Sequence, residues 1–333
     1  MQQKNELNQP LTSSMVRDRP LRDRVGIYIQ ATNTVDAIAR IREAEHSGVQ
    51  QAWMATGSAG FADILTVLAV AATQTERIKL GTAIVPDYSR HPLAMAQQAL
   101  ALHDLAPGRL RLGVGSGDRS ALETRYGLSQ TAPLRYLKEY LEVLRGVLWK
   151  GSIDYQGEFF HVVDTLPRTA QIPLLIPTLG LKAFRLAGEV ADGALASLCP
   201  VPHLLNQALA ALRTGAEASG RPAPPIVACL PVVLSTDEAA VLVAVRQLLQ
   251  QVVHRSTYAR MFAQAGWASA LNGDEAQLNA LARSLVISGN EATVRDRVQE
   301  LLTGGLDELL LLALPIVDEA TERKQLLHLI GTL

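Results

Sequence analysis

Cysteine is scarce in this sequence. Its 333 residues include only two cysteines, Cys199 and Cys229, too few for a disulfide scaffold. The two could pair with each other, but both lie in apolar, strand-like surroundings, where buried free thiols are the expected state. Because free thiols persist in a reducing compartment, we predict a cytoplasmic protein.

Excess charge and long apolar runs are also missing, and aromatic side chains are scarce. The formal net charge is −1 and aromatic residues make up 5% of the chain, which leaves neither a basic surface nor a stacking platform for nucleic acid. No apolar run reaches the roughly 18 to 20 residues of a membrane span. The seven histidines are dispersed, without the spacing of metal ligands. We therefore expect no nucleic acid, no membrane and no bound metal.

Apolar residues, by contrast, make up 48% of the chain and recur in a regular order. Short runs typical of buried parallel strands alternate with segments of helical periodicity. The predicted strands cover residues 25–29, 51–55, 80–86, 108–118, 172–176, 193–198, 226–234 and 308–314. Eight strands, each followed by a helix, predict an α/β fold, the (β/α)8 TIM barrel; a doubly wound sheet is the alternative.

Two stretches exceed this repeating pattern, one after the fourth strand and one after the seventh. The first contains residues 151–163, which alternate as in a β-hairpin. The second is a helical insertion of about residues 242–284, for which a lid, a subunit contact or a solvated surface are open alternatives. Residues 1–22 are polar and predict a flexible or loosely docked N-terminal tail. Residues 23–333 form one predicted domain, since no linker interrupts them.

The stretch from Leu80 to Asp118 holds the best candidate for a ligand site. Two strands that end in small residues flank a helix of residues 93–105, and α/β folds bind their ligands in the loops that follow such strand ends. Gly113, Gly115 and Gly117 either let the strand end pack closely or leave room for a flat ring. Asp118 either faces that ring or caps the next helix. These glycines do not match the dinucleotide-binding fingerprint, because its third glycine would fall at the position of Asp118.

Gly180 marks a second candidate. It follows the predicted strand at residues 172–176 and precedes a helix start. Backbone N–H groups and the positive end of that helix would bind a phosphate there. A helix entry without a ligand is the alternative.

Some side chains have simpler expected roles. His91 is predicted to cap or brace its loop, and Trp53 to pack in the core. Asp104 and Arg109 are predicted to pair across the turn between a helix and a strand.

Three ordered blocks of the sequence resemble the luciferase-like flavin and deazaflavin oxidoreductases. They are Leu-Gly-Thr-Ala-Ile-Val-Pro-Asp-Tyr-Ser-Arg-His-Pro at residues 80–92, Gly-Arg-Leu-Arg-Leu-Gly-Val-Gly-Ser-Gly-Asp at residues 108–118, and Leu-Ala-Gly-Glu-Val-Ala-Asp-Gly-Ala at residues 186–194. Within that superfamily the sequence is most similar to methylenetetrahydromethanopterin reductase and related coenzyme F420-dependent enzymes. The likeness runs from about residue 25 to the C-terminus, without most of the insertion.

The resemblance implies a TIM barrel with a cofactor ring at the mouth formed by the strand C-termini. It also implies that the peptide bond between Ala83 and Ile84 is cis and lies against this ring. The cofactor-binding residues that it implies are Thr56, Ala83, Ile84, Gly115, Ser116, Gly117, Thr178, Leu179 and Gly180. Among them, residues 178–180 match the phosphate-binding turn of the family.

Asp118 and Tyr28 match family positions that orient the substrate or relay a proton, so they are the implied catalytic residues. One departure concerns the second strand, which family members usually end with Trp-x-x-Asp/Glu-His. Here Trp53 is followed by Met-Ala-Thr-Gly, so both the acid and the histidine are missing.

The resulting hypothesis is an oxidoreductase that transfers a hydride between reduced coenzyme F420 and a small organic substrate. An FMN-dependent luciferase-like monooxygenase is the alternative, and a flavin-binding barrel without turnover is a third hypothesis. The resemblance also implies that the protein forms a homodimer.

Overall fold

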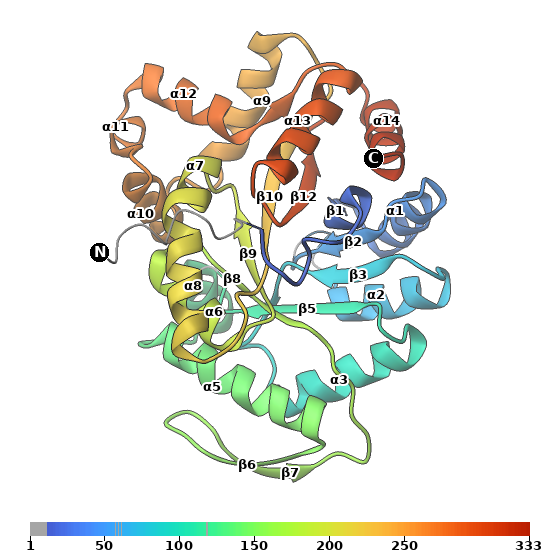
Figure 1. Cartoon of the computed structure of the whole chain (residues 1–333), viewed down its shortest axis with the longest axis vertical. Helices are drawn as coiled ribbons and strands as arrows, with labels where there is room; N and C mark the ends of the chain where they lie inside the picture. The colour runs from blue at the N-terminus through green and yellow to red at the C-terminus, as the bar shows by residue number, and fades with distance from the viewer. Residues whose placement is uncertain (1–11, 57, 59, 61, 118) are drawn as a thin grey trace, which may run out of the picture.

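The computed structural model describes residues 12–56, 58, 60, 62–117 and 119–333. Within them, eight parallel strands close into a barrel in which β12 pairs with β1 and β9 pairs with β10 (Figure 1). In barrel order these strands are β1 (Val25–Tyr28), β2 (Gln51–Met54), β3 (Lys79–Thr82), β5 (Leu110–Gly115), β8 (Leu174–Pro177), β9 (Gly193–Ser197), β10 (Ile226–Val233) and β12 (Glu308–Ala313). This closed ring confirms the predicted (β/α)8 TIM barrel and excludes the doubly wound sheet, which has two open edges.

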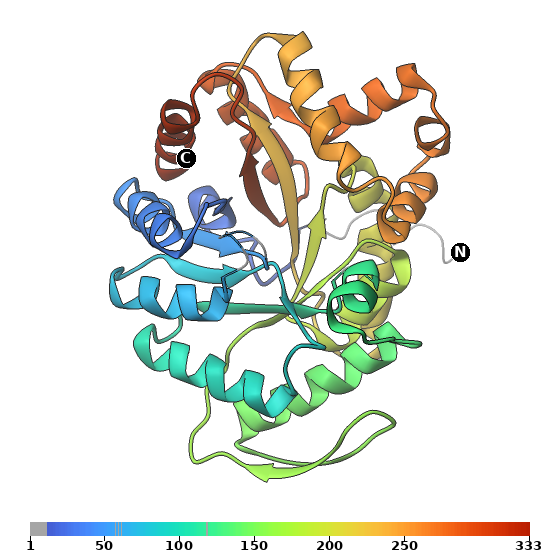
Figure 2. The same cartoon turned by 180° about the vertical axis from the view of Figure 1, so that it is seen from behind.

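Helices follow the strands and cover the outside of the barrel (Figures 1 and 2). They are α1 (Thr34–His46), α2 (Ile64–Thr73), α3 (Pro92–Leu105), α4 (Arg119–Tyr126), α5 (Pro133–Arg145), α6 (Leu181–Val190), α7 (Val201–His203), α8 (Leu209–Ala218), α13 (Glu291–Thr303) and α14 (Glu319–Gly331). Shorter turns are η2 (Leu21–Arg24), η3 (Gly146–Lys150) and η4 (Leu204–Ala208). The apolar faces of these helices pack on the outer faces of the strands, where the main core lies.

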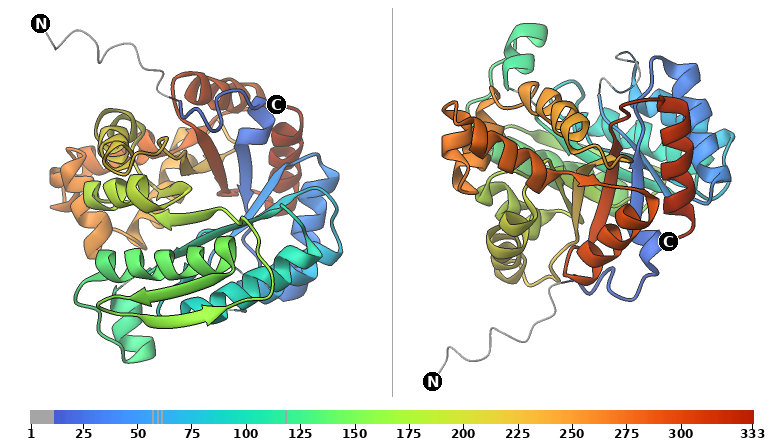
Figure 3. Two further views of the ribbon diagram at one scale, coloured as in Figure 1. Left: turned by 60° about the horizontal axis from the view of Figure 1, so that its bottom comes forward. Right: turned by 90° about the horizontal axis from the view of Figure 1, so that it is seen from above.

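The additional elements lie where the sequence exceeds the barrel pattern. The predicted hairpin is present as the antiparallel pair β6 (Ser152–Gln156) and β7 (His161–Thr165). The insertion contains α9 (Glu238–Gln250), α10 (Ser256–Gln264), α11 (Ala268–Leu271) and α12 (Glu275–Leu285). The short strands β4 (Val85–Pro86) and β11 (Ile287–Ser288) pair in parallel with the ends of β5 and β10, respectively. Figure 1 shows the hairpin and the insertion at opposite ends of the molecule, and Figure 3 shows the hairpin beside α5.

The largest side chain in the interior of the barrel is Trp53 of β2, which is 1% exposed and packs with apolar residues of β8, β9, β10 and β12. Two neighbouring strands carry glycine opposite it. A Cβ on Gly81 would lie 2.2 Å from the indole ring, and one on Gly26 would lie 3.0 Å from it. Trp53 therefore packs in the core as predicted, and these glycines provide its space.

Below Trp53, towards the amino ends of the strands, the interior becomes polar. Arg111 of β5 donates to both carboxylate oxygens of Glu308 of β12, at 2.6 and 2.9 Å. Gln51 of β2 donates to the same carboxylate at 3.1 Å and accepts from Arg111 at 2.6 Å. The buried charges thus compensate each other, and this end of the barrel is closed by side chains.

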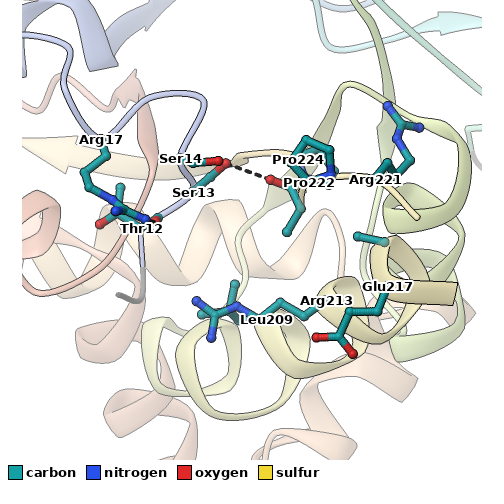
Figure 4. A pocket seen from close by; sticks show the side chains of 12 residues that line it. Thr12, Ser13, Ser14, Arg17, Leu209, Arg213, Glu217, Arg221, Pro222 and Pro224 are labelled. Atoms are coloured by element: carbon teal, nitrogen blue, oxygen red, sulfur yellow. Dashed lines mark hydrogen bonds between the residues drawn. The ribbon is translucent and has the colours of Figure 1, made fainter. Parts of the chain in front are cut away.

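The N-terminal segment that the structure describes packs against the amino end of the barrel. Val16 is buried, and the Ser13 N–H donates to Asp307 at 2.5 Å. A cavity of about 250 Å³ lies between this segment and α8 (Figure 4). Arg17 and Arg221 line it, but Arg17 donates to the Thr12 carbonyl and Arg221 to Asp192. Since TIM barrels bind their ligands at the opposite end, this cavity belongs to the structural side of the fold.

Candidate active site

The predicted site residues lie at the carboxyl ends of neighbouring barrel strands, an edge that we call the rim. Tyr28 ends β1, Thr56 follows β2, residues 83–84 follow β3, Gly115 ends β5 and residues 178–180 follow β8. These strands are consecutive in the barrel, so the residues form one continuous arc of the rim. TIM-barrel enzymes place their active sites on this face.

The exits of β2 and β3 are joined at the rim. The peptide bond between Ala83 and Ile84 is cis, as the resemblance implies, and both side chains pack against the interior cluster around Trp53. Thr56 lies beside this bond, because its N–H and its hydroxyl donate to the Ile84 carbonyl at 3.4 and 3.3 Å. Three of the predicted cofactor-binding residues are therefore in one place.

The three glycines at and after the end of β5 have different surroundings, so the reason for a glycine differs between them. A Cβ on Gly113 would lie 2.1 Å from the Thr82 carbonyl oxygen, and one on Gly115 would lie 2.4 Å from Pro177. Close packing explains both. Gly117 has a φ of +62° and nothing within 4 Å of its Cβ position, so it is the one of the three with open space beside it. Asp118, the next residue and a predicted catalytic group, lies outside the described residues.

The rim also holds a carboxyl group that the sequence analysis missed. Asp87 follows β4 and is fully buried. Ser116 donates to its Oδ2 at 2.9 Å, while its Oδ1 has no hydrogen-bond partner among the described residues. Burial raises the pKa of Asp87 to about 6. The sequence contained one signal for this group, because Asp87 is an acidic residue directly after the apolar strand predicted at residues 80–86.

Tyr28 lies among other hydroxyl and thiol groups. Ser58 donates to its phenolic oxygen at 3.1 Å, and burial raises the pKa of Tyr28 to about 12. The phenol is therefore neutral near pH 7. Cys229 and Tyr258 are close enough to influence the pKa of Tyr28, and Ser197 hydrogen-bonds both of them. Because Tyr258 belongs to α10, the insertion contributes a side chain to this part of the molecule.

The turn after β8 combines a buried residue with an open helix end. The N–H and the hydroxyl of Thr178 both donate to the Leu195 carbonyl, at 2.8 and 3.2 Å, so Thr178 anchors the turn to β9. Gly180 is the N-cap of α6, and its position carries no side-chain cap hydrogen bond and nothing within 4 Å of a Cβ. The start of α6 is thus available to an anion, whereas the donors of Thr178 are already used.

The end of β2 differs from the family pattern in the way the sequence indicates. Trp53 fills the barrel, and Met54 is fully buried against the helices. The four residues that follow Trp53 in the sequence include neither an acid nor a histidine. Cys199 and Cys229 are free and buried, as predicted. The part of the chain that the structure describes contains no cluster of three or more metal-ligating side chains, and no helix in it is long and apolar enough to cross a bilayer.

The sequence of this chain is similar to those of several known enzymes. The 5,10-methylenetetrahydromethanopterin reductase of Methanolobus tindarius is 29% identical over 199 residues, which cover 59% of this chain and 60% of the reductase. The F420-dependent glucose-6-phosphate dehydrogenase of Nakamurella multipartita is 34% identical over 180 residues, covering 51% of this chain and 52% of that enzyme. The chain thus matches about half to three fifths of the length of these relatives.

A solved structure supports the fold. The oxygenating constituent of 3,6-diketocamphane monooxygenase from Pseudomonas putida, determined in complex with FMN, superposes with a TM-score of 0.71 at 17% identity, covering 92% of this chain and 96% of that one. The model of the luciferase-like monooxygenase family matches residues 22–308. That match covers most of the barrel and all of the rim described above, and the chain belongs to the luciferase-like monooxygenase family.

Proposed function

We propose that this chain binds the deazaflavin coenzyme F420 at the rim and transfers a hydride between it and a small organic substrate. The observation that carries the proposal is the start of α6, which lacks a side-chain cap and lies on the same rim as Ala83–Ile84 and Tyr28. The relative from Nakamurella, named as F420-dependent, supports the choice of a deazaflavin. FMN is the alternative cofactor, since it is bound by a monooxygenase of the same fold.

The residues present fit such a group. The backbone N–H groups at the start of α6 would bind its phosphate, and Gly180 leaves the approach open. Gly117 and the half-buried pair Ala83–Ile84 would contact the ring. A deazaflavin supplies a ring carbon that gives or takes a hydride, which moves two electrons together.

The contribution of the chain is positioning. Thr56 holds the Ile84 carbonyl, and Thr178 holds the turn that precedes α6. The neutral Tyr28 phenol, fixed by Ser58, would orient a polar group of the substrate by a hydrogen bond. The apolar interior below the rim, centred on Trp53, excludes water from that side.

Equilibrium binding tests the proposal. Purified protein freed of cofactor is titrated with coenzyme F420 and with FMN, and the fluorescence of each is followed. We expect tight binding of F420 and weak binding of FMN. A preference for FMN would transfer the assignment to the oxygen-dependent branch of the family, and binding of neither would contradict a cofactor site at the rim.

A variant of the α6 start sharpens the test. Gly180→Asp introduces a good N-cap residue, so the helix remains stable, but its carboxylate repels a phosphate. We expect the Kd of F420 to rise about tenfold, equivalent to about 1.4 kcal/mol. Ala239→Asp is the control, because it adds the same charge to the exposed first turn of α9. An equal effect of both variants would contradict phosphate binding at α6.

A further inference from the structure

Asp87 is a buried carboxyl group that the fold does not need in its charged form. It lies directly after β4, which pairs with the end of β5, and its own N–H donates to the Gly115 carbonyl at 3.2 Å. Its side chain is 0% exposed. Only Oδ2 has a partner among the described residues, the Ser116 hydroxyl at 2.9 Å. A buried carboxylate oxygen without a partner is costly, so its presence needs a reason.

Other buried carboxylates of this chain have a clear structural role. Glu45 accepts from the N–H groups of three successive residues, 76–78. Asp307 accepts from the Ser13 and Ile226 N–H groups through its two oxygens. Each of these side chains joins distant backbone segments. Among the described residues, Oδ1 of Asp87 has no hydrogen-bond partner, and Oδ2 accepts from the side chain of Ser116 at the rim.

Among the described residues, no positively charged side chain lowers the pKa of Asp87. Burial raises the pKa of Tyr136 and of Tyr140 in α5, and the charge of Asp87 raises both further, so these side chains are close enough to interact with Asp87. The Tyr140 hydroxyl donates to the Arg90 carbonyl at 3.1 Å, and the Arg90 guanidinium pairs with Asp63. The Ser116 hydroxyl and the N–H groups of Asp87 and Tyr88 favour the carboxylate, but burial outweighs them. Proton uptake by Asp87 near neutral pH follows from this environment.

We propose that Asp87 and Ser116 form a proton-holding pair, in which the protonation of Asp87 decides whether Ser116 offers a hydrogen-bond acceptor or a donor at the rim. When Asp87 is ionised, the Ser116 O–H is directed to Oδ2, and the lone pairs of Ser116 Oγ remain for a ligand. When Asp87 carries a proton, its own O–H donates to Ser116 Oγ, and the Ser116 O–H is released to the ligand. Ser116 is half-buried, whereas Asp87 has no exposed surface, so Ser116 is the member that a ligand contacts.

This step rests on the proposed function. The pair transfers the proton that accompanies hydride transfer between the substrate and the cofactor. A deazaflavin or flavin would supply the acceptor for the hydride, with its two electrons, that is removed from an alcohol substrate. The proton of its hydroxyl passes to Ser116 Oγ while the Ser116 proton moves to Asp87 Oδ2. In carbonyl reduction the same protons move in the opposite direction, from Asp87 to Ser116 and from Ser116 to the new hydroxyl. Asp87 is thus a positioning residue that stores the proton. The pair compensates for the acid and histidine missing after Trp53.

The test measures the proton directly and then its effect on binding. In protein labelled with 13C at aspartate carboxyl carbons, we expect both Asp87 and Asp307 to titrate near pH 6, and the loss of one resonance in Asp87→Asn identifies the one whose midpoint belongs to Asp87. Ser116→Ala removes a hydrogen bond that favours the carboxylate, so it moves this midpoint to higher pH. Ser116→Thr retains the hydroxyl and the original midpoint. Ser89→Ala is the matched control, because its hydroxyl donates to the Pro86 carbonyl.

The binding of F420 and FMN is then measured from pH 4.5 to 8.5. We expect the Kd of the bound cofactor to change several-fold about a midpoint near pH 6 in the wild type, and to lose this step in Asp87→Asn and Ser116→Ala. A midpoint that Ser116→Ala leaves unchanged, or a binding step that survives in both variants, would overturn the pair. Absence of binding at every pH would contradict the proposed function, while the carboxyl titration still decides whether Asp87 and Ser116 are coupled.

Discussion

At the scale of single residues, the chain places its buried carboxylates in two kinds of environment. Glu45 and Glu308 are surrounded by donors that lower their pKa, so they stay ionised. Asp87 and Asp307 each have a pKa raised to about 6, because burial exceeds the effect of their hydrogen bonds. The first kind stabilises the fold at neutral pH. The second kind costs stability there. Asp307 compensates for this cost by accepting from the Ser13 and Ile226 N–H groups, whereas Asp87 has a side-chain partner only in Ser116 among the described residues, which is the pattern of a group retained for chemistry.

This cost predicts how Asp87→Asn changes stability with pH. The folded-state pKa of about 6 lies above the unfolded value of about 3.9, so the folded wild type binds more protons than the unfolded chain between these values. Its stability therefore falls as pH rises from about 4 to 6. Asparagine does not ionise, so the variant does not lose stability in this pH range, and its amide oxygen can still accept the hydrogen bond from Ser116. We expect the variant to be more stable above pH 7, by up to about 3 kcal/mol, with the difference disappearing near pH 4.

Urea unfolding of both proteins at pH 4, 5, 6, 7 and 8 measures this difference. A variant that is less stable than the wild type by a constant amount at every pH would mean that Asp87 is ionised at no cost. In that case the carboxylate would be structural.

Single side-chain contacts also show what the sequence could predict. His91 caps α3 by accepting from the Leu93 N–H at 3.2 Å, as predicted, since its partner is two residues away. The predicted pair of Asp104 and Arg109 is wrong. Asp104 pairs with Arg168, while Arg109 donates to the Ala72 and Ile78 carbonyls and to Thr75. Such partners lie far away in the sequence, and the tertiary fold selects them.

At the scale of elements, glycine and tryptophan on adjacent strands determine how the barrel is filled. Gly81 of β3 lies against the Trp53 ring of β2, and backbone pairing fixes the distance between these strands. The sequence showed Gly81 only as a small residue in a strand. Its partner became evident once the register was known, because Trp53 and Gly81 are directly paired.

Gly81→Ala tests this packing. The added methyl group would lie 2.2 Å from the indole ring, so the ring or the strand must move, and we expect a loss of about 1 to 3 kcal/mol in unfolding free energy. Gly180→Ala is the control, since its Cβ meets nothing within 4 Å. Equal stability of the two variants would show that Trp53 does not fill the barrel in the way described.

At the scale of the whole molecule, the order of strands followed from the sequence pattern, because each strand is a short apolar run bounded by polar or small residues. The barrel strands begin within two residues of their predicted starts. The docking of residues 12–24 could not be predicted in this way, since Arg24 and Asp307 bond to distant backbone groups. Likewise, the positions of Asp87 and Tyr258 near the rim could not be predicted, because they depend on how the strands and the insertion are arranged in space.

Arg24 connects the two ends of this architecture, and its removal is predicted to weaken the whole barrel. It is buried and donates to the carbonyls of Leu302, Leu306 and Asp307, at 3.3, 2.6 and 2.7 Å. Arg24→Leu leaves these three acceptors unsatisfied, so we expect a loss of about 2 to 4 kcal/mol in urea unfolding. The exposed Arg22 is the control, and Arg22→Leu should change stability by less than about 0.5 kcal/mol. Similar losses in both variants would contradict a closing role for Arg24.

The bonds of Arg24 also constrain when the protein can fold during its synthesis. Arg24 and Asp307 are 283 residues apart in the sequence, and β1 gains its second neighbour only when β12 has been made. A chain growing on the ribosome therefore carries an unpaired β1 edge and an uncompensated guanidinium while the 283 residues that follow Arg24 are made. Such an edge pairs readily with other strands. The protein is consequently expected to depend on a chaperone that shields nascent chains more than a protein whose first segment folds by itself.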